Sequence, residues 1–114
     1  MVRAFVVGVF AVLLAGPCVA RTLTVGGYMQ ESREDIKGFN KIWLDGAYGG
    51  LTAANGFLVA AGKPPLLCQS SKMAMTNDQI LSVLDLYLAA HKTRSDTPVN
   101  IVLLRALREA FPCS

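Results

Sequence analysis

The sequence has 114 residues, of which 53% are hydrophobic, and it carries eleven Lys and Arg against eight Asp and Glu. A chain of this length holds one domain with a modest core, and basic residues scattered among acids argue against nucleic-acid binding. The mean hydropathy of +0.42 owes much to residues 1–20.

Residues 1–20, MVRAFVVGVFAVLLAGPCVA, are predicted to be a cleaved signal peptide. Arg3 precedes an uncharged apolar run that is too short to span a bilayer. Small side chains at Cys18 and Ala20 suit signal peptidase, so we expect cleavage between Ala20 and Arg21. Lipidation of Cys18 is the alternative, but Pro17 occupies the position where a small residue is needed. No later apolar run approaches membrane length, so we expect no membrane contact after cleavage.

Residues 21–30 are predicted to be a flexible start, followed by one domain over 31–114. Segment 31–61 is predicted to form one long helix or two shorter ones, because apolar and small residues recur every three or four positions: Ile36, Phe39, Trp43, Ala47, Gly50, Ala54, Phe57 and Ala61. Each glycine inside a helix costs about 1 kcal/mol relative to alanine. We therefore expect another backbone to approach near Gly46, Gly49, Gly50 and Ala53, or a kink there; a broken helix is the alternative.

Gly62 and Pro64 are predicted to end this segment, and a short apolar strip then leads to Cys68. The next helix is predicted over 77–91. Thr76 and Gln79 form a capping box before it, and its apolar stripe consists of Ile80, Val83, Leu84, Tyr87 and Leu88.

A polar connection of Lys92, Thr93, Arg94, Ser95 and Asp96 follows. The last helix is predicted to have Thr97 as N-cap and Pro98 at its first position. Its predicted buried stripe is Val99, Val102, Leu103, Ala106, Leu107, Ala110 and Phe111, and Pro112 ends it. No segment alternates with a period of two. The sequence thus predicts an all-α fold, a small single-domain bundle of three to four helices.

The cysteines indicate one disulfide. Cys18 leaves with the signal peptide, so Cys68 and Cys113 remain as an even pair in an exported protein. Two free thiols are the alternative. A bond that closes a loop of this size stabilises a protein by about 4 kcal/mol. The prediction is that one disulfide staples the helices.

The residue types argue against catalysis and against a metal site. Cys68, His91 and Asp96 are the types found in cysteine hydrolases, but a disulfide would remove the thiol nucleophile. One histidine and two paired cysteines are too few for a metal centre. We therefore expect no enzyme activity, no cofactor and no metal.

Three stretches resemble a known family: GAYGGLTAANGFLVAAGKPPLLC, TNDQILSVLDLYLAAH and VLLRALREAFPC. Together they are similar to the Rap/Tai immunity proteins, which protect bacteria against amidase toxins of type VI secretion systems. The matching positions span about 36 to 113 and include Gln79, Val83, Leu86 or Tyr87, Leu88, Ala106, Leu107, Ala110, Phe111, Pro112 and Cys113. Family members often have a Pro soon after the first cysteine, where this chain has Gln69, Ser70 and Ser71.

This resemblance implies a periplasmic helical protein that forms a homodimer and occludes the active site of a peptidoglycan amidase toxin. The connection Lys92–Asp96, or the segment from Gln69 to Met75, is the candidate protrusion that would enter the toxin. Two other functions stay open: an acid-stress chaperone similar to the small HdeA-like periplasmic proteins, and a non-catalytic interaction module that kept the fold without a toxin partner.

Overall fold

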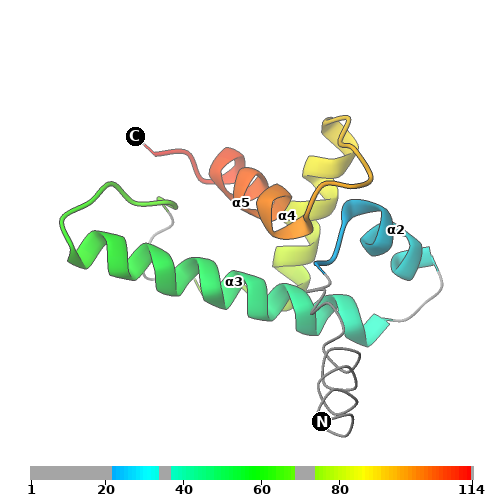
Figure 1. Ribbon diagram of the computed structural model, residues 1–114, viewed down its shortest axis with the longest axis horizontal. Helices are drawn as coiled ribbons and strands as arrows, with labels where there is room; N and C mark the ends of the chain where they lie inside the picture. The colour runs from blue at the N-terminus through cyan, green and yellow to red at the C-terminus, as the bar shows by residue number, and fades with distance from the viewer. Residues whose placement is uncertain (1–21, 34–36, 69–73, 114) are drawn as a thin grey trace, which may run out of the picture.

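The computed structural model describes residues 22–33, 37–68 and 74–113. They contain four α-helices, α2 (Val25–Arg33), α3 (Lys37–Ala60), α4 (Asn77–Ala90) and α5 (Val99–Ala110), and no strand longer than the single bridge between Thr24 and Pro98 (Figure 1). A disulfide joins Cys68 and Cys113. The all-α prediction with three to four helices and one disulfide is confirmed. The predicted signal peptide, with its cleavage site at Ala20 and Arg21, lies outside the described residues.

α3 is the longest helix, and the other three lie mainly along its first half (Figure 1). Only part of the apolar repeat noted in the sequence faces the core. Leu44 is 1% exposed and Asn40 6%, whereas Phe57 is 75% exposed. Trp43 and Ala47 from the repeat pack against the core, whereas its later members, such as Phe57, are exposed.

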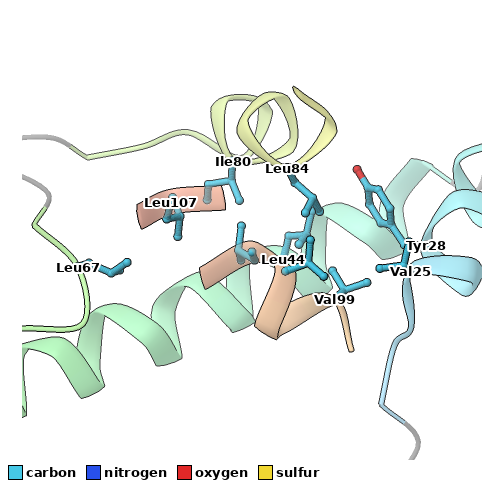
Figure 2. Packing of buried hydrophobic residues seen from close by; sticks show 10 residues of the cluster. Val25, Tyr28, Leu44, Leu67, Ile80, Leu84, Val99 and Leu107 are labelled. Carbon is cyan, nitrogen blue, oxygen red and sulfur yellow. The ribbon is translucent and has the colours of Figure 1, made fainter. Parts of the chain in front are cut away.

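The core forms where α3, α4 and α5 meet and α2 covers one edge (Figure 2). The predicted stripes on the last two helices supply most of it. Ile80 and Leu84 from α4 and Leu103 from α5 are fully buried, whereas Ala110 is exposed and Phe111 half-buried. The buried hydrophobic cluster comprises Val25, Tyr28, Leu44, Leu67, Ile80, Leu84, Val99, Val102, Leu103 and Leu107.

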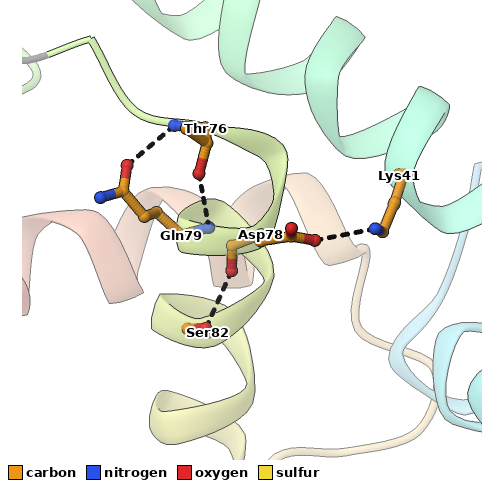
Figure 3. A network of polar contacts seen from close by, with 5 residues as sticks. All are labelled: Lys41, Thr76, Asp78, Gln79 and Ser82. Carbon is orange, nitrogen blue, oxygen red and sulfur yellow. Dashed lines mark hydrogen bonds and ion pairs between the residues drawn. The ribbon is translucent and has the colours of Figure 1, made fainter.

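The capping box at the start of α4 is confirmed (Figure 3). The Thr76 hydroxyl accepts a hydrogen bond from the Gln79 backbone N–H at 3.3 Å, and the Gln79 side chain accepts one from the Thr76 N–H at 2.8 Å. Lys41 Nζ lies 2.8 Å from the Asp78 carboxylate, which connects α3 to this first turn. Local sequence therefore sets where α4 begins, and an exposed ion pair links its first turn to α3.

Replacing the N-cap should destabilise the protein. We expect Thr76→Ala to lower the free energy of unfolding by about 1 kcal/mol in urea denaturation, because one helix N–H loses its acceptor. Ser82→Ala is the matched control: its hydroxyl donates to the Asp78 carbonyl inside the same helix, so its loss should change stability little. Equal losses in the two variants would contradict the capping role.

α3 ends in a Schellman motif at the predicted glycine. Gly62 has a φ of 70°, its N–H donates to the Val59 carbonyl at 3.0 Å, and the Lys63 N–H donates to the Leu58 carbonyl at 2.9 Å. A left-handed residue at this place satisfies the last carbonyls of the helix, and glycine adopts it without strain. The chain then turns back along the end of α3 toward Cys68.

We expect Gly62→Ala to lower the free energy of unfolding by about 1–2 kcal/mol, the cost of a left-handed conformation for a residue with a Cβ. Gly56→Ala provides the opposite case, because no atom lies within 4 Å of the added methyl group inside α3. It should raise stability by up to about 1 kcal/mol. The two variants can be compared by thermal unfolding, and a fully stable Gly62→Ala protein would disprove the motif's contribution.

The returning segment is held by one side chain. The Asn55 amide donates to the Leu67 carbonyl at 3.1 Å and accepts from the Leu67 N–H at 3.0 Å, so it pairs with backbone as a neighbouring strand would. Leu67 is buried, and Cys68 follows it directly. Asn55 thereby places Cys68, whose Cα lies 5.0 Å from that of Cys113.

The predicted flexible start at 21–30 is wrong for the residues that the structure describes. Helix α2 begins at Val25, its N-cap Thr24 accepts a hydrogen bond from the Gly27 N–H at 3.2 Å, and Val25 and Tyr28 are buried. The Tyr28 hydroxyl donates to Asp85 on α4 at 2.7 Å. These contacts hold the segment against the core.

The start of α5 differs from the prediction by one residue. Pro98 is the N-cap, with an extended backbone, and Thr97 lies outside the helix. The reason is tertiary: the Thr97 carbonyl accepts from the Val25 N–H, and the Val99 N–H donates to the Leu23 carbonyl, each at 2.9 Å. Backbone groups of the N-terminal segment thus take the place of a side-chain cap at the start of α5.

Candidate functional site

The connection between α4 and α5 contains the predicted partner-binding residues Lys92, Thr93, Arg94, Ser95 and Asp96. All are exposed except the half-buried Thr93. The Arg94 guanidinium forms two hydrogen bonds with the Asp96 carboxylate, at 3.1 and 2.8 Å. The Thr97 N–H donates to the Arg94 carbonyl at 3.1 Å, which closes a turn. The connection is therefore a folded polar loop at the end of two packed helices.

The structure brings Arg94 and Asp96 together, and Ser95 stands at the turn between them. Lys92 has no ion-pair partner among the described residues. Exposed ion pairs contribute little to stability, so the Arg94–Asp96 pair is a weak contact that shapes the loop only locally. This surface presents charged and polar groups to solvent.

A second polar contact lies where the loop leaves α4. His91 Nε2 is 2.8 Å from Glu109 Oε2 on α5, and the His91 ring stacks on Tyr87 with 4.2 Å between ring centroids. His91 was expected near the helix end, and its C-cap position agrees with this. A shallow groove of about 370 Å³ begins beside this contact, and it is lined by Val83, Leu86, Tyr87, Ala90, Ala106, Glu109 and Ala110.

The three residues considered as a cysteine-hydrolase set each have another partner. Cys68 is bonded to Cys113, His91 contacts Glu109, and Asp96 contacts Arg94. Figure 1 shows the C-terminal end of the chain well away from the loop between α4 and α5. This set is not assembled into one site.

The second candidate for a protrusion, Gln69 to Met75, lies mostly outside the described residues. Met75 is described: it is half-buried and packs against the hydrophobic core. Of the two segments, the structure therefore gives a site geometry only for the α4–α5 loop.

A further surface runs along α3, opposite the core. We call it the α3 outer face; its residues, all exposed, are Phe39, Ile42, Gly46, Gly49, Gly50, Ala53 and Phe57. A Cβ added at Gly46, Gly49 or Gly50 would meet no atom within 4 Å in the part of the chain that the structure describes. Among the described residues, no other backbone makes the predicted close approach, and α3 is one continuous helix rather than two.

The geometry of the α3 outer face suits a second helix. Phe39, Ile42, Gly46, Gly49 and Ala53 follow each other at alternating spacings of three and four residues, the spacing of helices that pack along their length. Small residues at such positions let two backbones come close. A groove of about 570 Å³ adjoins the face, and it is lined by Ile42, Trp43, Gly46, Ala47, Gly50, Leu51 and Asn100.

Sequence reasoning missed the N-terminal contribution to the loop. The Gly26 N–H donates to the Ser95 carbonyl at 2.9 Å, beside the bonds of Val25 and Leu23 described above. A threonine two residues before a glycine pair was the only local signal, since Thr24 caps α2. The pairing with Ser95 spans most of the chain and leaves no pattern in the sequence.

No three His, Cys, Asp or Glu side chains among residues 22–33, 37–68 and 74–113 are grouped so that they would hold a metal ion. None of the four described helices combines the length and apolar character needed to cross a membrane.

Comparisons with known protein families, with curated proteins and with solved structures find no match to this chain.

Proposed function

We propose that this protein is an exported immunity protein that binds a type VI secretion peptidoglycan amidase and occludes its active site. The observation that carries the proposal is the exposed polar loop Lys92–Asp96, which is folded by local contacts and is paired with the N-terminal segment through the Ser95 carbonyl. An inhibitor needs no catalytic group; it needs a preorganised surface whose ordering costs little on binding. The resemblance of the motifs in α3, α4 and α5 to the Rap/Tai proteins supports the same function.

The proposal includes a homodimer formed through the α3 outer face. Residues 46–62 contain no charged side chain, so a partner that brought a charge to this face would have to bury it unpaired. The α3 outer face of a second copy of the chain brings no charged side chain to this contact. A two-fold axis would place identical patches against each other, and Gly46, Gly49 and Gly50 would allow close contact.

The test of the function is inhibition. The mature chain, beginning at Arg21, is expected to inhibit at least one amidase in a panel of purified peptidoglycan amidases, followed by release of peptide from cell-wall sacculi. Arg94→Ala should weaken inhibition by at least about thirtyfold if Arg94 is a hot spot of the interface. Lys41→Ala, which breaks an exposed ion pair on another surface, is the matched control and should inhibit normally.

The outcomes separate the alternatives. If the chain inhibits none of the amidases in the panel, the result would contradict the immunity function and favour an interaction module with another partner. Suppression of client aggregation at acid pH, without amidase inhibition, would favour the chaperone. If the Arg94→Ala protein inhibits normally, the loop is not part of the interface, but the inhibitory function still stands.

Export to the periplasm belongs to the same proposal. N-terminal sequencing of protein isolated from the periplasmic fraction should begin at Arg21. A protein that retains Met1 and remains in the cytoplasm would contradict both the cleavage site and the location.

A further inference from the structure

Residues 23–26, which we call the N-terminal strap, pair with the second half of the connection between α4 and α5 and with the first residue of α5. The Val25 N–H donates to the Thr97 carbonyl and the Gly26 N–H to the Ser95 carbonyl, while the Leu23 carbonyl accepts from the Val99 N–H. All three distances are 2.9 Å. Within four residues, the strap thus provides three backbone hydrogen bonds to a segment about seventy positions later in the chain.

We propose that the N-terminal strap is a positioning element that sets the orientation of the Lys92–Asp96 loop for its partner. The inference rests on the proposed function, in which this loop contacts the amidase. The loop's other hydrogen bonds are local: they join Arg94 to Asp96, Thr93 to His91 and Thr97 to Arg94. Local bonds shape the loop, but they do not fix it relative to the rest of the domain.

The strap itself is anchored in the core. Val25 is 3% exposed and Tyr28 2%, and the Tyr28 hydroxyl bonds to Asp85 on α4. The Asn40 amide on α3 donates to the Tyr28 carbonyl at 3.3 Å. A continuous series of packed and hydrogen-bonded groups therefore runs from α3 and α4 through the strap to the loop, so the loop is ordered before any partner arrives.

Gly26 is the position where this arrangement depends on the absence of a side chain. A Cβ at Gly26 would lie 3.2 Å from the Ser95 Cβ and 3.2 Å from the Ser95 carbonyl oxygen. That oxygen accepts the Gly26 hydrogen bond, so it cannot move away without weakening the bond. At Gly27 an added Cβ would make only ordinary contacts, at 3.4 Å to Leu23 and 3.5 Å to Thr24. The two neighbouring glycines thus provide a test and its control.

The first arm of the experiment needs no partner. In the purified mature chain, hydrogen exchange of the Val25, residue-26 and Val99 amides reports on the strap. Gly26→Ala should accelerate their exchange at least about tenfold, because the hydrogen bonds to the loop are strained or broken. Gly27→Ala should leave these rates unchanged. The Ile80 amide in α4 checks that the core is intact in both variants. Unchanged exchange of the strap amides in Gly26→Ala would overturn the proposal.

The second arm measures amidase inhibition with the same proteins. Gly26→Ala should raise the inhibition constant at least about tenfold, and Gly27→Ala should match the unaltered chain. If Gly26→Ala loosens the strap yet inhibits normally, the positioning role is overturned and the immunity function stands. If the unaltered chain inhibits no amidase, the immunity function and the strap's role in toxin binding fall together, and the first arm still decides whether the strap orders the loop.

A milder variant covers the case in which Gly26→Ala does not fold. Combining Gly26→Ala with Ser95→Gly removes one of the two close contacts, and Ser95→Gly alone controls for the missing hydroxymethyl group. The strap amides of the double variant should exchange faster than those of Ser95→Gly, and its inhibition should be weaker, because the close contact with the carbonyl oxygen of residue 95 remains. Equal exchange rates in the double variant and in Ser95→Gly, or faster exchange in the double variant with inhibition equal to that of Ser95→Gly, would overturn the proposal.

Discussion

The double substitution Ile42→Asp with Phe57→Asp is expected to convert a dimer of this chain into monomers. Each of these side chains is 75% exposed on the α3 outer face. Burying a side chain of this size contributes about 1.5–3 kcal/mol, and a two-fold dimer buries each of them twice. The loss should therefore weaken self-association at least about a thousandfold. Sedimentation velocity over a series of protein concentrations measures this directly.

Leu86→Asp is the matched control for the dimer. Leu86 is also largely exposed, at 71%, but it lies on α4 beside the α4–α5 groove rather than on α3. The Leu86→Asp protein should associate normally. An unaltered chain that sediments as a monomer at every concentration, or a double variant that still dimerises, would refute pairing through the α3 outer face. Circular dichroism should show unchanged helicity, because neither Ile42 nor Phe57 belongs to the core.

Removing the disulfide is expected to cause the largest loss of stability. Cys68→Ser with Cys113→Ser should lower the free energy of unfolding by about 4 kcal/mol, the chain-entropy value for a bond between residues 45 positions apart. Domains of this kind are stable by about 5–15 kcal/mol, so the loss is a large share of the total. Urea denaturation of the variant and of the unaltered chain, without reductant, gives the difference.

Reduction of the unaltered chain with dithiothreitol should reproduce the effect of the substitutions, which separates loss of the bond from side effects of the serines. Because Asn55 still holds Leu67 through two hydrogen bonds, we expect the reduced protein to keep its fold at low temperature. A loss below 1 kcal/mol would show that the Asn55 contacts already restrict the chain as much as the bond does.

Features encoded within a few residues were predictable from the sequence. The Thr76 capping box and the Gly62 helix end depend on neighbouring residues alone, and both occur as expected. The buried stripe of α5 was largely correct as well, because Val99, Val102 and Leu103 stand opposite exposed charged residues and only one face can be apolar. Local chemistry and a clear polar face were sufficient in these cases.

Features that depend on contacts between distant segments were not predictable. α3 has no polar face over its second half, so the sequence could not decide between the Leu44 side and the Phe57 side. α2 is short and contains two glycines, and it is held by Asp85, Asn40 and the α4–α5 loop. The polar loop was identified as a candidate from its composition, but its support by Gly26 and Val25 required the three-dimensional structure.

The bond between Cys68 and Cys113 has a topological consequence for the loop between α4 and α5. Residues 68–113 form a closed covalent ring, and α4, α5 and the exposed Lys92–Asp96 segment all belong to it. A protease that cuts the chain once at this segment therefore opens the ring without separating the molecule into two pieces. The helices on either side of the cut stay tethered to each other until the disulfide is reduced, so a nicked molecule still holds both halves of its core at high local concentration.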